Sequence, residues 1–311
     1  MKVLVTGASG FIGSHVTRAL LQRGHQVGIL AVPGDPISRL QGVKSRFKTI
    51  HANLEDVDLV ARAVRECQPQ ACIHLAWYAE PGKYLHSKKN VQSLSSSLSL
   101  FQALIEAGCN QIVAAGTCLE YDTDFGYLRE DTPTRPKSLY GAAKLSCCLI
   151  GSQLAIKAGT SFAWSRIFYP YGPREDARRL IPSAIAALTQ HKPFQATAGE
   201  QIRDYIHVAD VASAFCTLME RRAEGVYNIS SGIPVTIHQL LKIIGQEMDR
   251  TDLIKLGALS YRAWEPQFVC GDNRRLKKLG WTTSLSLHEG LCDMIRSTLN
   301  RFEQQENLKW M

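Results

Sequence analysis

The sequence lacks the features of several protein classes. No C-x-x-C pair occurs among its nine cysteines, and this odd number in a chain of 311 residues argues against a disulfide framework. No apolar run approaches the roughly 18 residues that cross a bilayer, and the N-terminus shows no signal-peptide pattern. We therefore expect a cytoplasmic protein with no membrane contact and with reduced, mostly buried cysteines.

Repeats, linkers and metal-binding motifs are also missing. No Pro/Gly/Ser-rich segment divides the chain, and no G-x-x-x-x-G-K-[ST] motif occurs, which makes a P-loop nucleotidase unlikely on sequence grounds. The nine histidines show no H-E-x-x-H or comparable spacing, so no metal site is predicted. With 45% hydrophobic and 21% charged residues, the composition is that of an ordinary globular protein.

Acidic residues are outnumbered by basic ones. The chain has 36 Lys and Arg against 28 Asp and Glu, a net charge of +8. Such an excess predicts an anionic partner, but nucleotides, nucleic acids and phospholipid surfaces all satisfy it.

Short β-branched runs alternate with amphipathic segments in the first half of the chain. Strands are expected at 3–6, 27–30, 71–75 and 111–115, and helices near 11–23, 56–67 and 86–108. This alternation predicts βαβ units and hence an α/β fold with a doubly wound parallel Rossmann sheet. We assign 1–168 to that domain, with a return at about 203–226, and assign 169–202 and 227–311 to a smaller C-terminal α+β substrate lobe.

The predicted helix at 86–108 carries an apolar stripe. Residues at three- and four-residue steps form it, namely Val91, Leu94, Leu98, Phe101 and Ile105. The stripe can pack on the core, and the helix can also pack against a second subunit. A homodimer through helices near 86–108 and 138–158 is therefore expected.

A glycine-rich turn follows the first strand. In Thr6-Gly7-Ala8-Ser9-Gly10-Phe11-Ile12-Gly13, Gly7 permits the tight turn, Gly10 lets backbone approach a pyrophosphate, and Gly13 lets the helix lie close to the sheet. The free N–H groups of the following helix favour phosphate binding. The pattern predicts a dinucleotide site.

The second strand lacks the carboxylate that usually binds the ribose 2′-hydroxyl of NAD. It ends Leu30-Ala31-Val32-Pro33, and Arg39 is placed to meet a 2′-phosphate. NADP is therefore favoured over NAD, although Arg39 can equally be a solvated helix residue.

A tyrosine and a lysine four residues apart are the first catalytic candidates. Tyr140 and Lys144 lie on one face of a predicted helix, so the ammonium is expected to lower the phenol pKa from about 10 toward neutrality. Thr117 follows a strand at the carboxyl edge of the sheet, where parallel sheets bind ligands. Its hydroxyl can donate to a substrate oxygen and exchange a proton with Tyr140.

With these elements in this order, the chain resembles the extended short-chain dehydrogenase/reductases of the nucleotide-sugar epimerase/dehydratase family. Further resemblances span nearly the whole length: Asn53-Leu54, with Asn in place of the usual Asp, His74-Leu75-Ala76, Asn90-Val91, Arg166 to Pro173, Arg203 to Val208, and Leu279-Gly280-Trp281.

The resemblance implies a role for each matching residue. Thr117, Tyr140 and Lys144 would be catalytic, and Pro170 would lie beside the nicotinamide. The other cofactor contacts would come from Gly7, Ser9, Gly10, Phe11, Ile12, Gly13, Asn53, Leu54, Leu75, Ala76, Trp77 and Asn90. Arg203 and Arg262 would hold the diphosphate of a nucleotide-sugar substrate, with Thr117, Cys118 and Tyr169 near the sugar. Asn90 can instead bridge strands, and Arg262 can instead pair with Glu265.

The residues after Thr117 narrow the reaction. Family dehydratases have an Asp-Glu pair where this chain has Cys118 and Leu119, and decarboxylating members tend to have Glu at the second of these positions. Glu120 is one position off and, on a strand, would face away. Dehydration and decarboxylation are therefore disfavoured, and a reaction that changes only the sugar C4 is expected. A 4-ketoreductase is favoured over an NAD-dependent 4-epimerase because the second-strand carboxylate is missing. Tyr169, in place of the usual Asn, suggests an uncommon sugar.

A nucleic-acid-binding protein on a Rossmann scaffold is the rival hypothesis. Its basis is the charge excess and two basic clusters, Arg174/Arg178/Arg179 and Arg274/Arg275/Lys277/Lys278. No basic stripe with interleaved aromatics accompanies them, and the Tyr140/Lys144 pair argues for turnover, so no nucleic-acid partner is expected.

Overall fold

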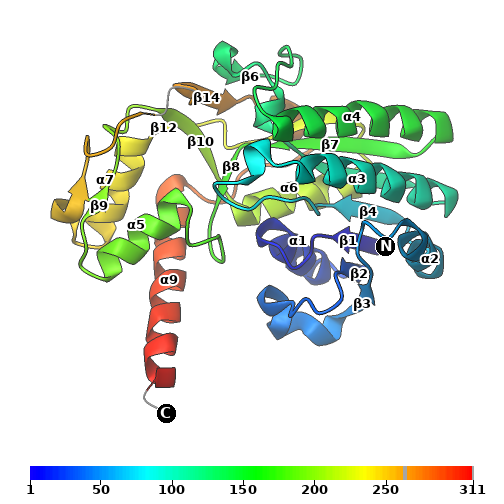
Figure 1. Cartoon of the computed structure of the whole chain (residues 1–311), viewed down its shortest axis with the longest axis horizontal. Helices are drawn as coiled ribbons and strands as arrows, with labels where there is room; N and C mark the ends of the chain where they lie inside the picture. Colours follow the sequence, from blue (N-terminus) through cyan, green and yellow to red (C-terminus); the bar gives the residue numbers. More distant parts are fainter. Residues whose placement is uncertain (262–264, 310–311) are drawn as a thin grey trace.

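A seven-stranded parallel sheet organises the larger part of the molecule. The computed structural model describes residues 1–261 and 265–309, with side chains described as far as Glu303. The strands lie in the order β11-β7-β5-β4-β1-β2-β3 (Figure 1). Their bounds are β1 (Lys2–Thr6), β2 (Gln26–Ala31), β3 (Phe47–His51), β4 (Ala71–His74), β5 (Gln111–Thr117), β7 (Ser161–Ile167) and β11 (Gly225–Ile229).

Helices cover both faces of this sheet. One face carries α1 (Phe11–Gln22), α6 (Val208–Glu220) and the 3₁₀ segment η1 (Ser38–Arg46), and the other carries α2 (Val57–Cys67), α3 (Lys89–Glu106) and α4 (Leu139–Ala158). Successive strand residues point to opposite faces, so Val3 and Val5 enter the first core and Leu4 the second. The predicted doubly wound α/β fold is confirmed.

A smaller lobe lies beside the sheet. Its own sheet contains β12 (Pro234–Thr236), β10 (Ile202–His207), β14 (Phe268–Gly271) and β6 (Tyr127–Leu128), with β8 (Tyr169–Tyr171) paired to β10. The helices α5 (Leu180–Thr189), α7 (Ile237–Glu247) and α9 (Leu287–Lys309) form a separate core (Figure 1). The remaining elements are η2 (Tyr84–His86), η3 (Cys118–Glu120), η4 (Thr123–Phe125), β9 (Phe194–Gln195), η5 (Thr251–Leu253), β13 (Ile254–Lys255) and α8 (Arg274–Lys277).

The chain crosses between the two parts more often than the predicted boundaries suggest. Within the expected return at 203–226, β10 joins the smaller sheet, whereas α6 packs on α1 and β11 forms the edge of the larger sheet. The short strand β6, inside 1–168, pairs with β14. The division of the chain into a cofactor-binding domain and a substrate-binding lobe stays a prediction.

The buried side of α3 matches the predicted stripe in part: Phe101 is fully buried, and Leu94, Leu98 and Ile105 pack half-buried against the core. Val91 is 56% exposed, whereas Ser97, Leu100 and Leu104 are buried. Ser97 faces the sheet because its hydroxyl hydrogen-bonds the Nε2 atom of buried His74 at 2.8 Å. Small side chains therefore lie on the core side of this helix, where they permit close packing, and the apolar stripe is only half-buried at several positions.

The helix α4 corrects the expectation about apolar length. Among the described residues it is the one helix long and apolar enough, by length and composition, to cross a membrane. It packs on α3 and on strands β5 and β7, and it buries Gly141, Ala143, Lys144, Cys147 and Cys148. Its apolar character therefore serves packing on both the sheet and the neighbouring helix.

Candidate functional site

The glycine-rich turn joins β1 to α1 at the carboxyl edge of the sheet. Gly7 has φ +69°, and a Cβ there would lie 2.6 Å from the backbone nitrogen of Ala76. A Cβ on Gly13 would lie 2.0 Å from the carbonyl oxygen of Gly7, so helix and turn touch through backbone alone. Gly10 caps α1 with no side chain over the free N–H groups. This bare cradle fits a dinucleotide pyrophosphate.

Arginines gather beside this turn. Arg39 donates from Nε to the carbonyl of Arg174 at 3.1 Å and from a terminal nitrogen to the carbonyl of Ser9 at 3.3 Å. Burial lowers the pKa of Arg174, and nearby Arg18, Arg301 and Arg39 lower it further. Arg39 is thus a half-buried residue held against the turn, and it belongs to a cluster of cations.

The other predicted cofactor residues fall into two groups. Asn53 and Leu54 follow β3 at the same sheet edge, Asn53 exposed and Leu54 half-buried. Asn90, in contrast, is completely buried, and its amide donates to the carbonyls of Tyr84 and Ser87. Its oxygen accepts from the indole of Trp77 at 2.9 Å. In this structure Asn90 fixes the segment between β4 and α3.

Tyr140 and Lys144 lie on α4 inside an aromatic enclosure. The Lys144 ammonium donates to the carbonyl of Ala115 at 2.7 Å and lies 3.8 Å from the centroid of the Trp77 ring. The Tyr140 ring packs edge to face on Tyr84 at 4.9 Å and on Trp77 at 6.5 Å between centroids. The structure therefore brings the two predicted catalytic side chains together under aromatic cover.

The expected lowering of the Tyr140 pKa is wrong for the cofactor-free protein. Burial is the largest influence and raises that pKa, Tyr84 and Glu120 add to the rise, and a hydrogen bond with Thr117 only partly opposes it. Burial also lowers the pKa of Lys144 to about 8. Near neutral pH the phenol is therefore un-ionised and able to donate a proton.

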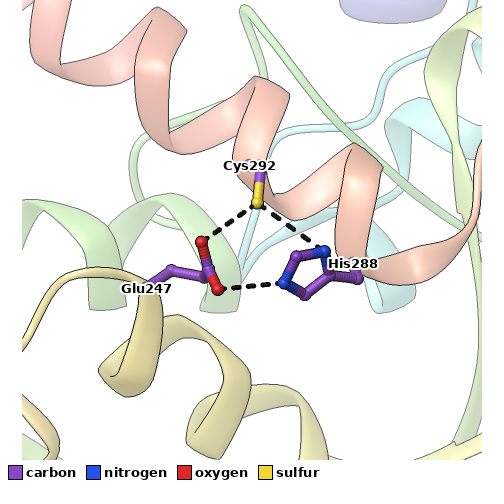
Figure 2. Close-up of side chains that lie close together, drawn as sticks. All are labelled: Glu247, His288 and Cys292. Atoms are coloured by element: carbon purple, nitrogen blue, oxygen red, sulfur yellow. Dashed lines mark hydrogen bonds and ion pairs between the residues drawn. The ribbon is translucent and has the colours of Figure 1, made fainter.

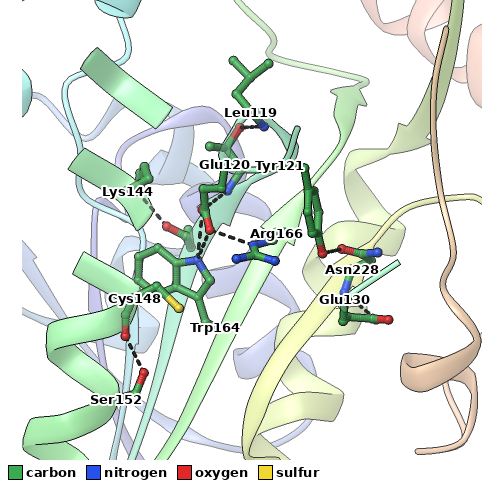
Figure 3. A network of polar contacts seen from close by, with 12 residues as sticks. Leu119, Glu120, Tyr121, Glu130, Lys144, Cys148, Ser152, Trp164, Arg166 and Asn228 are labelled. Carbon is green, nitrogen blue, oxygen red and sulfur yellow. Dashed lines mark hydrogen bonds and ion pairs between the residues drawn. The ribbon is translucent and has the colours of Figure 1, made fainter. Parts of the chain in front are cut away.

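Thr117 is positioned by the buried carboxylate of Glu120. That carboxylate accepts from the backbone nitrogen of Thr117 at 2.8 Å, from the indole of Trp164 at 3.0 Å and from Nε of Arg166 at 2.7 Å (Figure 3). Glu120 was expected on a strand, but it lies in the 3₁₀ segment η3. Its carboxylate points into the core, because the three groups that donate to it are all buried.

Three predicted substrate residues come together on the smaller-lobe side. Burial raises the pKa of Cys118 and of Tyr169, and nearby Arg203 partly opposes both rises. The guanidinium carbon of Arg203 lies 5.5 Å from the centroid of the Tyr169 ring. Arg203 is only 2% exposed and pairs with Glu265 at 2.9 Å. Pro170 lies between Tyr169 and Tyr171 in β8. Arg262 lies outside the described residues.

Each of the two basic clusters that motivated the nucleic-acid hypothesis contains an arginine in an ion pair. Arg178 pairs with Asp176 at 2.8 Å, and Arg274 pairs with Asp272 at 2.6 Å. A cavity of about 750 Å³ beside the second cluster is lined by both signs of charge, namely Arg129, Glu130, Asp131, Asp272, Arg274, Arg275 and Lys278. This mixed surface is unlike a phosphate-binding stripe.

Several site residues escaped sequence reasoning. Tyr84 covers Tyr140, and Glu120, Trp164 and Arg166 hold Thr117 in place. For Glu120 a signal was available, because Thr117 and Glu120 have the spacing of a capping box, which the structure contains. No local pattern marks Tyr84 or Trp164, since their partners lie far away in sequence.

Comparison with known proteins agrees with this geometry. The sequence profile described as "NAD dependent epimerase/dehydratase family" matches residues 3–230. The chain belongs to this family. It is therefore an enzyme of the class that contains NAD-dependent nucleotide-sugar epimerases, dehydratases and reductases.

Individual relatives carry different activities in their names. A UDP-glucose 4-epimerase of Corynebacterium glutamicum is 27% identical, with 91% of each chain covered. A dTDP-4-dehydro-6-deoxyglucose reductase of Escherichia coli is 25% identical over 95% of this chain and 96% of its own. The structure of MoeE5 in complex with UDP-glucose and NAD has a TM-score of 0.84 and 26% identity, covering 97% of this chain and 100% of that one.

Replacing Glu120 by Gln should destabilise the protein strongly. The amide would direct N–H groups at N–H donors and leave Arg166, which is 4% exposed, without its counter-charge. We expect a loss of about 3–5 kcal/mol in the free energy of unfolding, measured by urea denaturation. Glu220→Gln, in an exposed pair with Arg23, is the control and should cost less than about 1 kcal/mol. A similar small loss for both variants would contradict the role given to Glu120.

Replacing Lys144 by Met should stabilise the cofactor-free protein at pH 7. The folded-state pKa of Lys144 is about 8, and the ordinary value is 10.5. The buried ammonium therefore lowers the free energy of unfolding at pH 7. This loss of stability disappears as the pH rises from 8 to 10.5, because the lysine then becomes neutral in both the folded and the unfolded protein. We expect the variant to gain up to about 3 kcal/mol at pH 7 and less at higher pH, measured by urea denaturation across that range. Lys157→Met, at the exposed end of the same helix, should show no such trend. A destabilised Lys144→Met at pH 7 would mean that the Ala115 and Trp77 contacts outweigh the burial cost.

Proposed function

We propose that this enzyme transfers hydride at C4 of a nucleotide-diphosphate sugar, and that it acts as an NADPH-dependent 4-ketoreductase on a 4-keto-(6-deoxy)hexose. The main support for this proposal is that the residues next to Thr117 include no acid–base pair. Removing a C5 proton and expelling a C6 hydroxyl requires an acid–base pair next to the sugar. Cys118 and Leu119 supply none, and the Glu120 carboxylate is fully engaged in the core.

In the proposed reduction, each catalytic side chain has one task. Nicotinamide, when bound, supplies the hydride to C4. Tyr140 donates its proton to the C4 oxygen, which suits a phenol that burial keeps un-ionised. The Thr117 hydroxyl would orient the same oxygen, and the Lys144 ammonium would stabilise the phenolate that remains after transfer.

The arginines beside the glycine turn support NADP as the cofactor. The second strand ends Ala31-Val32-Pro33 and offers no carboxylate to a ribose 2′-hydroxyl. Arg39 lies against the turn, within the field of Arg174 and Arg301, and the buried Nε atom of half-buried Arg18 has no hydrogen-bond partner among the described residues. Mutual repulsion among these cations would be relieved by a 2′-phosphate.

The substrate side is proposed from three described residues. Arg203 is suited to a diphosphate once it exchanges its Glu265 partner, and Cys118 and Tyr169 would border the sugar. The replacement of Asn by Tyr at 169 adds an aromatic face that favours a less polar sugar, such as a 6-deoxyhexose.

We also propose a homodimer formed by α3 and α4. Leu149, Ile150 and Ile156 on α4 are 60%, 45% and 71% exposed, and Val91 on α3 is 56% exposed. An exposed apolar surface on two adjacent helices is typical of a subunit interface.

The reaction is tested with purified enzyme, NADPH and a panel of nucleotide 4-keto-6-deoxy sugars. We expect NADPH oxidation with at least one of them. Tyr140→Phe should lower kcat by about 10²–10⁴ while nucleotide binding, followed by fluorescence, stays unchanged. Interconversion of C4 epimers by enzyme with retained NAD, without NADPH oxidation, would instead establish the 4-epimerase. Salt-sensitive RNA binding without any nicotinamide binding would favour the nucleic-acid hypothesis.

The dimer is tested by sedimentation. The wild-type protein should sediment at twice the chain mass of 34.5 kDa, and Leu149→Glu should shift it toward the monomer because a carboxylate would be buried in an apolar interface. Ile233→Glu places the same charge at a position that is 59% exposed in the smaller lobe and serves as control. A monomeric wild type, or a Leu149→Glu dimer of unchanged affinity, would contradict the proposed interface.

A further inference from the structure

Three metal-ligating side chains meet on the smaller lobe, away from the glycine turn and Tyr140. His288 and Cys292 lie one turn apart on α9, and Glu247 is the last residue of α7 (Figure 2). Nε2 of His288 lies 2.9 Å from a Glu247 oxygen, and Sγ of Cys292 lies 3.2 Å from the other oxygen. Sγ is 3.9 Å from Nδ1 of the same histidine.

We propose that Glu247, His288 and Cys292 form a zinc-binding site that joins α7 to α9. One ligand atom from each residue lies within 4.8 Å of the others. Tetrahedral zinc, with bonds of about 2.0–2.3 Å, separates its ligand atoms by roughly 3.4–3.6 Å, so small side-chain rotations suffice. Thiolate, imidazole and carboxylate are the ligands that zinc prefers, and water can take the fourth position.

The donor set distinguishes zinc from harder cations. Ca²⁺ and Mg²⁺ require mostly oxygen ligands, and only one of these three residues supplies oxygen. The spacing of His288 and Cys292 by four residues places both on one face of α9. Both helices belong to the core of the smaller lobe, so the ion would fasten two elements that already pack together.

Metal binding exchanges protons for coordination bonds. Without metal the thiol of Cys292 donates to Glu247, and partial burial together with that carboxylate raises the pKa of Cys292. Zinc binding would release the thiol proton to solvent and replace the contacts with Glu247 by bonds to the ion.

Cobalt(II) is the probe for this site because a thiolate–cobalt bond gives a charge-transfer band. Of the nine cysteines, all within the described residues, eight are buried and Cys292 is partly exposed. The band therefore reports on Cys292. The full-length, chelator-treated protein should give this band with one Co²⁺ per chain, and Zn²⁺ should abolish it. Zn²⁺ should also raise the Tm.

Variants separate this site from adventitious binding. Cys292→Ser should remove the band, and His288→Ala should weaken Zn²⁺ binding by at least about 100-fold. His25→Gln, in a partly buried His–Glu pair with Glu220, is the matched control and should change neither result. The proposal is overturned if wild-type protein gives no thiolate–cobalt band, if the band survives Cys292→Ser, or if Zn²⁺ raises the Tm of Cys292→Ser as much as that of wild type.

Discussion

The buried carboxylate of Glu120 accepts hydrogen bonds from the end of β5 and from two side chains of β7. Its completely buried oxygens are reached by the Thr117 nitrogen, the Trp164 indole and the Arg166 guanidinium. Such a charge is costly to bury unless each lone pair is used. Because these donors belong to adjacent strands, the network fixes the point where β5 ends and where the Thr117 hydroxyl lies.

The neighbouring backbone is shaped to admit this network. A Cβ on Gly116 would lie 2.2 Å from the Trp164 indole nitrogen, so the indole reaches Glu120 only because position 116 is glycine. On α4, a Cβ on Gly141 would lie 2.5 Å from the carbonyl oxygen of Leu119. The helix that carries Tyr140 and Lys144 can therefore approach the turn after β5 closely. Close backbone packing and one satisfied carboxylate together position the three proposed catalytic side chains.

Sequence alone predicted the elements that depend on local pattern. The alternation of strand and helix patterns predicted a doubly wound parallel sheet, which has seven strands in the structure, and the glycine spacing predicted the turn whose tight packing the structure shows at Gly7 and Gly13. The proximity of Tyr140 and Lys144 followed from helical spacing. The burial of Ser97 on α3 was not predicted, because Ser97 forms a hydrogen bond to buried His74, and such a partner leaves no trace in a hydrophobic pattern.

What the sequence by itself determined is the dinucleotide turn and the Tyr140/Lys144 pair, since glycine turns and helical spacings act over a few residues and define local geometry directly; the class of enzyme came from the resemblance of these motifs to a known family. Only the tertiary structure decided the environment of each functional group. It raised the pKa of Tyr140 by burial, paired Arg203 with Glu265, and brought Glu247 beside His288 and Cys292. These outcomes depend on desolvation and on contacts between residues distant in sequence. Both arise only when the chain has packed, which is why local motifs named the residues but not their charge states or partners.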